Sequence, residues 1–277
     1  MIKESFIFFV NLTILTYYYL NTQYKMNFEL IKGIINGIYY IYWLSAKNPN
    51  KKEIKNNIKL GCETVFNTCK IKLNVHGYKM DNIPIIYVAN HHSYLDSVIL
   101  KYLLPNVHTI AKDDADKEFF LSNILKDVFD VWGVILYKRG NKKSGKKVRK
   151  LMAKHINGGG SILVYPEGKA IAIGGPKDFY PGSFEVAFNN KFLIQPITLK
   201  YETDITWGEK SKFSKKYHLD MITNINQCQK QINNVNVTFH PIINPNKFKS
   251  ADIMKQYCEV IIRDEWINRH HYTSSSI

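Results

Sequence analysis

Seven short apolar runs, spread over residues 71–239, constrain the fold of this chain more than any other sequence feature. Each run is four to seven residues long, which is the usual length of a buried strand. Several are separated by segments long enough for a helix, as in βα units. We therefore expect an α/β fold with a central mixed, largely parallel sheet flanked by helices. The runs are Ile71–Val75, Ile85–Ala89, His108–Ala111, Gly133–Tyr137, Ser161–Tyr165, Leu193–Leu199 and Val235–Phe239.

Two segments between and after these runs carry helical patterns. Lys142–His155 is a basic stretch that is followed by Asn157–Gly160, which contains three glycines. Glycine is common just beyond the end of a helix, so this order predicts a helix that ends before the next strand. Ala251–Asn268 has the apolar spacing of a last amphipathic helix. Both helices belong to one domain, which we expect over residues 71–277.

Two apolar stretches precede this domain. Ser5–Leu20 has no charged residue, and Leu30–Ala46 has only Lys32. A helix of this length is about 25 Å long, slightly shorter than the roughly 30 Å core of a bilayer. Each stretch therefore fits a short span, an interfacial helix or one half of a re-entrant hairpin. We expect residues 1–47 to form a membrane-anchoring helical hairpin.

Basic residues are in clear excess along the chain. Lys and Arg number 38 against 23 Asp and Glu, which gives a formal net charge of +15. Such an excess favours a polyanionic partner, which could be nucleic acid, an anionic membrane surface or a phosphate-bearing small molecule. Part of it lies in residues 48–70, which we interpret as a basic linker and helix. The polar stretch Asn48–Lys59 is the expected linker, at the membrane surface.

The four cysteines are scattered and form no Cys-x-x-Cys pair. This spacing predicts free thiols in a reducing compartment and argues against a structural zinc ion. The four are Cys62, Cys69, Cys228 and Cys258.

The sharpest local motif is Asn90–Asp96, with the sequence NHHSYLD, which directly follows the apolar run Ile85–Ala89. If a turn or helix start brings His91 and Asp96 together, the carboxylate accepts the proton on Nδ1. Nε2 is then left to take a proton from a hydroxyl. Open α/β sheets hold their ligands at the carboxyl ends of strands, where this motif lies. We therefore predict a catalytic dyad of His91 and Asp96.

The spacing of this dyad is not specific by itself. It recurs in His76/Asp81 and in His108/Asp113. His76 lies beside a Gly-Tyr-Lys turn, and His108 starts an apolar run. As a strand, that run would separate His108 from Asp113 by more than about 13 Å. Only the pair at the exit of a strand has the context of an active site.

The motif Asn-His-x-Ser-x-x-Asp resembles the first signature of the 1-acylglycerol-3-phosphate acyltransferases and related glycerolipid acyltransferases. Three later segments resemble the next signatures in the family's order. Gly133–Arg139 is similar to the second, a strand that ends in Arg, and Tyr165–Gly168 to the third, Phe-Pro-Glu-Gly-Thr-Arg. Gln195–Ile197 is similar to the fourth, an apolar strand with Pro, and Phe179–Glu185 to a Phe-Lys-x-Gly segment. The resemblance covers about residues 85–201, and four ordered matches are far more specific than one.

The resemblance implies the fold of the glycerolipid acyltransferases and an acyl-CoA-dependent reaction on a lysophospholipid. The expected acceptor is 1-acylglycerol-3-phosphate, which gives phosphatidic acid. Acyl-CoA is a co-substrate, and neither a cofactor nor a metal is implied. The implied partners are a phospholipid membrane, acyl-CoA and the lysophospholipid. The expected location is a membrane with the active domain facing the cytoplasm, at the endoplasmic reticulum in a eukaryote.

The resemblance also assigns roles to residues. His91 is the implied general base for the acceptor hydroxyl, and Asp96 orients it. Arg139 is expected at the acceptor's phosphate, and Glu167 at the glycerol hydroxyls or the acceptor as a whole. The full set of expected substrate-binding residues is Arg139, Glu167, Gly168 and Lys169.

Two positions depart from the family's pattern. Lys169-Ala170 stands where the family has Thr-Arg, and Tyr180 replaces the Lys of the later segment. In the family, the cations at both positions are expected to help hold the acceptor's phosphate. Because this chain lacks them, the acceptor headgroup stays open. Two other function classes stay open as well: an acyltransferase-like membrane scaffold without activity, and a basic nucleic-acid-binding protein. The latter has no helix-turn-helix, zinc-finger or RNA-recognition signature to support it.

Overall fold

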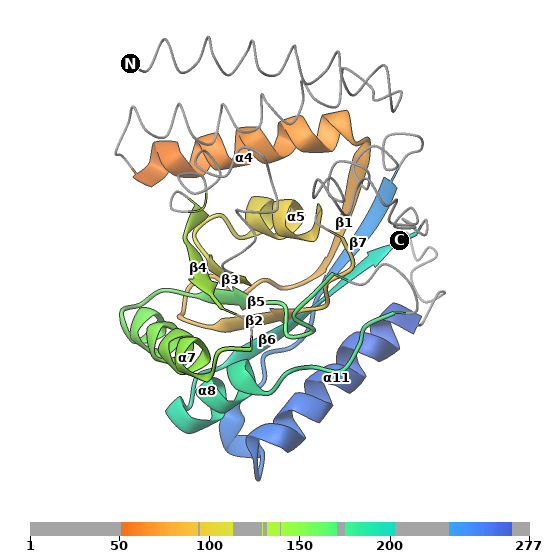
Figure 1. Ribbon diagram of the computed structural model, residues 1–277. Coiled ribbons are helices and arrows are strands. Elements are labelled where there is room, and N and C mark those ends of the chain that lie inside the picture. Colours follow the sequence, from red (N-terminus) through yellow and green to blue (C-terminus); the bar gives the residue numbers. More distant parts are fainter. Residues whose placement is uncertain are drawn as a thin grey trace, which may run out of the picture.

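The structure of the chain, a computed structural model, describes residues 51–93, 95–112, 129, 132–138, 140–170, 175–202 and 233–267 (Figure 1). The expected hairpin of residues 1–47 lies outside these ranges, as do Asp113, Arg139 and Cys228. Within these ranges, no helix combines the length and the apolar character that crossing a membrane requires.

The described strands form one seven-stranded sheet in the order β1-β7-β6-β2-β5-β3-β4. β6 and β7 are antiparallel neighbours, and every other neighbouring pair is parallel. The predicted mixed, largely parallel sheet is therefore confirmed, and each predicted strand ends within two residues of an observed one. The strands are β1 (Ile71–Gly77), β2 (Ile86–Ala89), β3 (His108–Lys112), β4 (Val134–Tyr137), β5 (Ile162–Val164), β6 (Ile194–Tyr201) and β7 (Asn233–Phe239).

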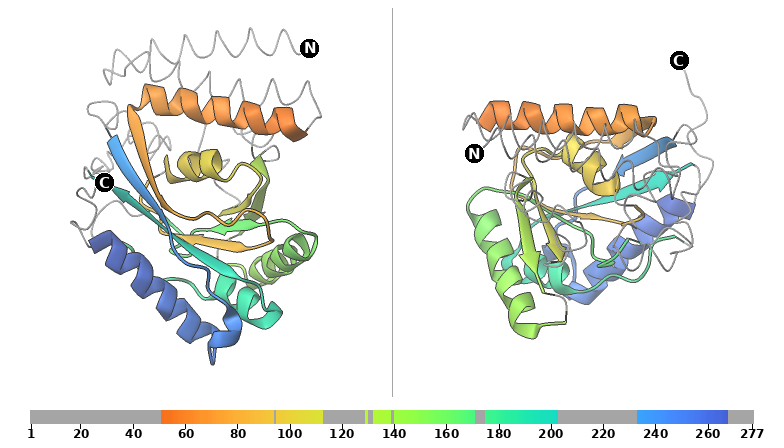
Figure 2. Two further views of the ribbon diagram at one scale, coloured as in Figure 1. Left: turned by 180° about the vertical axis from the view of Figure 1, so that it is seen from behind. Right: turned by 45° about the horizontal axis from the view of Figure 1, so that its top comes forward.

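Helices cover both faces of this sheet (Figures 1 and 2). On one face lie α4 (Lys51–Thr68) and α5 (Leu95–Leu103). On the other lie α7 (Lys142–Asn157), α8 (Gly182–Asn190) and α11 (Ala251–Ile267), the last preceded by the 3-10 turn η2 (Pro245–Lys247). The two helices predicted from sequence are confirmed as α7 and α11. The sheet is thus a middle layer between two helical layers.

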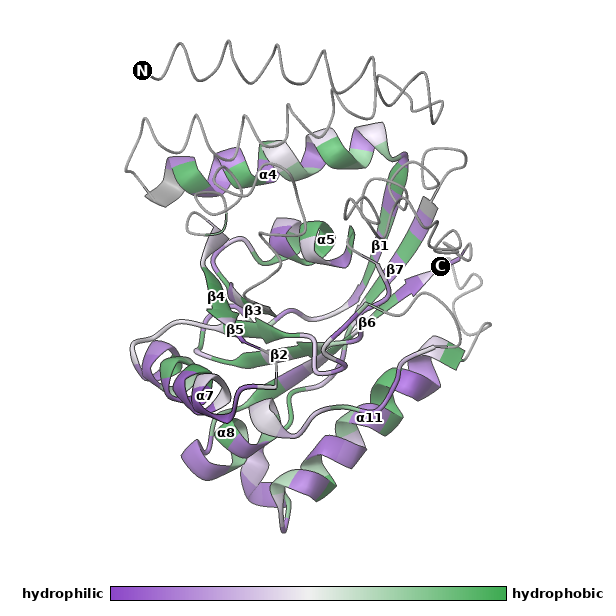
Figure 3. Ribbon diagram, in the orientation of Figure 1, coloured by the Kyte–Doolittle hydropathy of each residue, from purple (hydrophilic) through white to green (hydrophobic). Residues whose placement is uncertain are grey.

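β2 shows how one strand serves two cores. All four of its side chains are fully buried. Because alternate side chains point to opposite faces of a sheet, Tyr87 and Ala89 join the core beneath α4 and α5. Ile86 and Val88 join the core with α7, α8 and α11. Figure 3 shows the same division, with hydrophobic central strands and hydrophilic residues along α7. A strand buried on both faces reads as a continuous apolar run, which is why the sequence revealed it.

α4 corrects the expected linker. Residues from Lys51 onward belong to one helix of 18 residues. Ile58, Cys62 and Phe66 lie four residues apart along it and are buried in the core that α5 and the sheet share. That spacing places them on one stripe of a helix. The prediction of a polar linker is therefore wrong for residues 51–59, whose polar side chains belong to an amphipathic helix that packs on the domain.

Candidate active site

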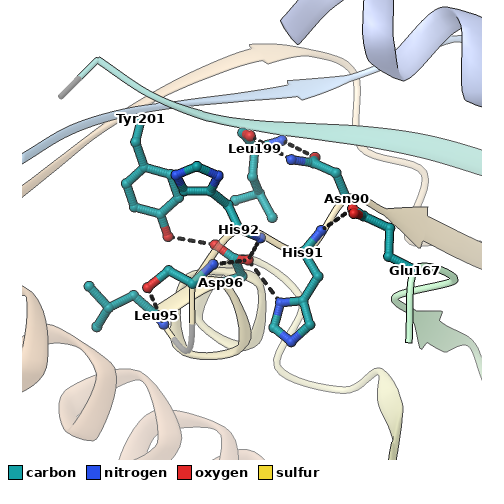
Figure 4. Close-up of polar contacts among 9 residues, drawn as sticks. Asn90, His91, His92, Leu95, Asp96, Glu167, Leu199 and Tyr201 are labelled. Carbon is teal, nitrogen blue, oxygen red and sulfur yellow. Dashed lines mark hydrogen bonds and ion pairs between the residues drawn. The ribbon is translucent and has the colours of Figure 1, made fainter. Parts of the chain in front are cut away.

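The chain leaves β2 at Asn90, the first residue of the predicted motif (Figure 4). Asn90 is buried, and its side-chain amide makes two hydrogen bonds with the backbone of Leu199 on β6. Nδ2 donates to the carbonyl at 2.8 Å, and Oδ1 accepts from the N–H at 2.7 Å. A side-chain amide carries a donor and an acceptor side by side, so it replaces a strand residue as the partner of β6. These bonds fix the chain one residue before His91.

Asp96 lies in the first turn of α5, and its side chain is fully buried. Its Oδ2 accepts from Nδ1 of His91 at 2.9 Å. The same oxygen accepts from the backbone N–H groups of His92, at 2.5 Å, and Ser93, at 2.8 Å. The chain turns back on itself as the helix begins, and this turn brings residues five apart into contact. The amino-terminal end of α5 also favours a negative charge at this place.

His91 is oriented as a base by this contact. The Asp96 carboxylate only accepts hydrogen bonds here, so Nδ1 of His91 carries the ring proton and Nε2 holds a lone pair. The second ring nitrogen points away from Asp96 (Figure 4). The side chain of His91 is 16% exposed, whereas that of Asp96 is 0% exposed. A substrate hydroxyl can therefore reach the imidazole but not the carboxylate.

Tyr201, at the end of β6, contacts the other oxygen of Asp96. Its hydroxyl donates to Oδ1 at 2.5 Å, and its ring stacks with that of His92 at a centroid distance of 5.1 Å. Both oxygens of the buried carboxylate are thus hydrogen-bonded. Sequence reasoning missed Tyr201 because it lies 105 residues from Asp96, and no local pattern marks it.

Glu167 reaches the loop that carries His91 from the turn after β5. It is only 4% exposed. Its Oε1 accepts from the backbone N–H of His91 at 2.8 Å, and its Oε2 from the backbone N–H of Lys177 at 2.9 Å. Burial raises the pKa of Glu167 to about 7, although the two N–H groups oppose this rise by favouring the charged form. Both carboxylate oxygens are therefore hydrogen-bonded to the main chain, one to His91 and the other to Lys177.

The same turn shapes the surroundings of the imidazole. The ring of Tyr165 stacks on that of His91, with 4.3 Å between centroids and 24° between planes. Gly168 has a φ of 70°, which glycine adopts without strain, and its N–H closes the turn onto the carbonyl of Tyr165 at 3.0 Å. Lys169 is exposed. The turn therefore brings Glu167 into contact with the backbone of His91, while Arg139 lies outside the described residues.

The two other histidine–aspartate pairs have different surroundings. His76 lies in β1, and the carboxylate of Asp81 is 3.0 Å from Nζ of Lys79. His108 begins β3, as predicted, and its ring stacks on His155 at a centroid distance of 4.0 Å. Of the three pairs, the described residues show a histidine–aspartate hydrogen bond for His91 and Asp96.

Comparisons with known proteins point to one family. Residues 72–200 match the family model described as Acyltransferase. The chain is 29% identical over 131 residues to a chloroplastic 1-acyl-sn-glycerol-3-phosphate acyltransferase of Arabidopsis thaliana, covering 46% of this chain and 36% of that protein. It is 28% identical over 116 residues to a chloroplastic enzyme of the same description from Brassica napus, covering 42% of this chain and 33% of that protein. The matched part thus spans about a third of the length of these curated relatives.

A solved structure matches nearly the whole chain. It is the crystal structure of the 1-acyl-sn-glycerophosphate acyltransferase PlsC from Thermotoga maritima, with a TM-score of 0.60 and 16% sequence identity. The match covers 95% of this chain and 97% of that chain, and it supports the fold described above. Residues 72–200 therefore match the acyltransferase family, and the resemblance of the chain to the 1-acylglycerol-3-phosphate acyltransferases is confirmed.

Proposed function

We propose that this chain transfers a fatty acyl group from acyl-CoA to the free hydroxyl of a lysophospholipid, with 1-acylglycerol-3-phosphate as acceptor and phosphatidic acid as product. The observation that carries the proposal is the 2.9 Å contact between Nδ1 of His91 and Oδ2 of the fully buried Asp96. The family match supports acyl transfer, and the names of the two plant relatives support this acceptor.

The proposed reaction is a direct transfer. Nε2 of His91 takes the proton of the acceptor hydroxyl while its oxygen forms a bond to the thioester carbonyl carbon. The carbon–sulfur bond then breaks, and the thiolate leaves readily because the pKa of a thiol is only about 8.5. The imidazolium returns its proton to the thiolate, which leaves His91 ready for the next turnover. Asp96 stabilises the imidazolium throughout but does not exchange a proton itself.

The acceptor is proposed to be held by its phosphate. Arg139 is the proposed main contact, since a guanidinium grips a phosphate through two parallel hydrogen bonds. Lys169 is exposed in the turn after Glu167 and adds a point charge. Ala170 offers no charge where the family has Arg, so the proposed enzyme discriminates weakly between lysophosphatidate and lysophospholipids with larger headgroups.

Membrane attachment belongs to the same proposal. Residues 1–47 are proposed as the anchor, and α7 as a surface that contacts anionic lipid headgroups. The first turn of α7 contains no acidic residue. The compartment stays a prediction from the sequence, with the active domain facing the cytoplasm. The exposed cations of α7 are Lys142, Lys143, Lys146, Lys147, Arg149, Lys150 and Lys154.

The deciding experiment incubates the purified full chain with acyl-CoA and a panel of lysolipids and identifies the products by mass. The expected result is a diacyl phospholipid that forms with the wild type and not with His91→Ala. Product formation of this kind excludes an inactive scaffold. It also shows an activity that a nucleic-acid-binding protein does not need. Absence of any acylated product across the panel would refute the proposed function.

A further inference from the structure

Glu167 joins two segments that are far apart in the sequence. One of its oxygens accepts from the backbone N–H of His91, on the catalytic loop. The other accepts from the backbone N–H of Lys177, on the segment that leads into α8. The carboxylate is buried, so no solvent competes for these bonds. A contact to the main chain of His91 fixes the position of this residue, whichever substrate is bound.

The second segment, residues 175–181, is itself held by α11. The N–H of Phe179 donates to Oε1 of the buried Glu259 at 2.5 Å. Nη2 of Arg263 lies 2.7 Å from Oδ1 of Asp178. Glu167 therefore connects the catalytic loop to a segment that a long helix holds in place.

A second fixed point lies one residue before His91 in the chain. Asn90 is bonded to the backbone of Leu199 through both ends of its amide. His91 thus follows a residue tied to β6 and is itself tied, through Glu167, to residues 175–181. Two restraints on consecutive residues fix the direction in which the His91 side chain leaves the main chain.

We infer that Glu167 is a positioning residue for acyl transfer, in which its ionised carboxylate clamps the backbone of His91 to the segment 175–181 and so fixes the place of the imidazole base. The inference rests on the proposed function for the reaction that this base serves. It gives Glu167 a task different from the acceptor contact that the family resemblance implies.

The clamp needs the charged form of Glu167. Both bonding partners are N–H donors. A protonated carboxyl would place its own O–H donor opposite one of them, and that hydrogen bond would be lost. The titratable groups that act on the carboxylate are His91 and Asp96, which have opposite effects on it. Since burial raises the pKa of Glu167 to about 7, the clamp closes as pH rises through neutrality.

Two substitutions test the clamp in different ways. Glu167→Gln keeps the size of the side chain but offers an acceptor oxygen to only one of the two N–H groups. Glu167→Asp keeps the charge but is shorter by one methylene, so that it no longer reaches both. The matched control is Glu185→Gln on α8, a half-exposed carboxylate that lies 3.9 Å from Arg149.

The first readout is amide hydrogen exchange in peptides that contain His91 and Lys177. Loss of a hydrogen bond to a charged group is expected to make exchange about tenfold faster or more at these two amides. The second readout is steady-state kinetics. A displaced base is expected to lower kcat by about 10- to 100-fold while KM for the acceptor stays the same. In Glu167→Gln the acidic limb of kcat/KM should also lose the protonation step that belongs to Glu167, and the control should match the wild type in all three measurements.

The outcomes separate the clamp from its alternatives. Unchanged exchange at both amides in Glu167→Gln and Glu167→Asp overturns the clamp. A raised acceptor KM with kcat retained also overturns it, because that result identifies Glu167 as a substrate ligand. If the wild type transfers no acyl group at all, the proposed function fails, and the exchange measurement alone still decides whether Glu167 holds His91 in place.

Discussion

The hydroxyl of Tyr201 lies 2.5 Å from Oδ1 of Asp96 and donates a hydrogen bond to it, while Oδ2 of the same carboxylate contacts Nδ1 of His91 at 2.9 Å. One buried carboxylate thus links the last residue of β6 to the imidazole. Since Asp96 is fully buried, water cannot replace a lost donor. Tyr201 therefore helps to stabilise the negative charge of Asp96, which the imidazole of His91 contacts, although Tyr201 does not touch His91 through this bond.

Tyr201→Phe removes this donor and keeps the ring that stacks with His92. We expect kcat to fall about tenfold, because a hydrogen bond to a charged group contributes about 1.5–3 kcal/mol and only part of it bears on the transition state. Tyr257→Phe, at an exposed position of α11, is the control and should behave as the wild type. A folded Tyr201→Phe variant with unchanged kcat would show that the three N–H donors suffice for Asp96.

The dyad itself gives the largest expected effect. His91→Ala should lower kcat by about 10²- to 10⁴-fold, the usual contribution of general-base catalysis. Asp96→Asn should also cost heavily, because an amide does not hold the proton on Nδ1 of His91 as a carboxylate does. His76→Ala and His108→Ala should keep most of the activity. Steady-state turnover of acyl-CoA measures all four, and a folded His91→Ala variant within a few-fold of the wild type would be incompatible with the mechanism.

Glu167 also makes a prediction about stability. Its pKa is raised from 4.5 to about 7 by burial, so the folded chain holds the carboxyl proton more tightly than the unfolded chain. The stabilisation from this proton is complete below about pH 4.5 and is lost as pH rises through about 7. Chemical unfolding from pH 5 to pH 8 should show Glu167→Gln gaining stability relative to the wild type, by up to about 3 kcal/mol in all. A difference that does not change with pH would mean that Glu167 titrates in its ordinary range.

Membrane attachment is tested by fractionation. With residues 1–47 present, the protein should sediment with membranes and resist extraction by high salt, because burial of apolar surface is not screened by ions. A variant in which the lysines of α7 are replaced by Gln should still sediment. Release of the wild type by salt alone would show that basic surfaces, and not the amino-terminal segment, hold it there.

The acceptor preference is tested at Ala170, which departs from the family's pattern, and at Arg139, which matches it. The wild type should use lysophosphatidate and lysophosphatidylcholine at comparable rates, and Ala170→Arg should shift its preference towards lysophosphatidate. Arg139→Ala should raise KM for phosphate-bearing acceptors by about ten- to a hundredfold, the usual cost of one charge-assisted contact. Kinetics with the two acceptors decide the matter. Strong wild-type selectivity for lysophosphatidate that survives Arg139→Ala would place the phosphate on other residues.

The sequence predicted the parts of this structure whose cause is local. Apolar runs revealed every described strand, and the exit of β2 identified His91 and Asp96 because both lie within one short turn. Contacts between distant segments left no such trace. Tyr201 is an ordinary strand residue in the sequence and becomes a partner of Asp96 only when β6 packs beside β2.

α4 illustrates the opposite error. Its first residues are so rich in Lys and Asn that composition outweighed the four-residue spacing of Ile54, Ile58 and Cys62. The helix forms because that narrow apolar stripe is buried against the sheet and α5. A tertiary contact of this kind decides whether a polar, basic segment is a linker or part of the core.

The bonds of Asn90 to Leu199 and of Asp96 to Tyr201 join residues 109 and 105 positions apart. A ribosome adds about 5–20 residues per second and releases the chain amino-terminal end first. The catalytic loop therefore leaves the ribosome about 5–20 s before β6, the strand that braces it. During that interval Asp96 lacks the hydroxyl of Tyr201, and Asn90 lacks the backbone of Leu199. The proposed transfer therefore cannot begin before β6 (Ile194–Tyr201) has emerged and paired with β2.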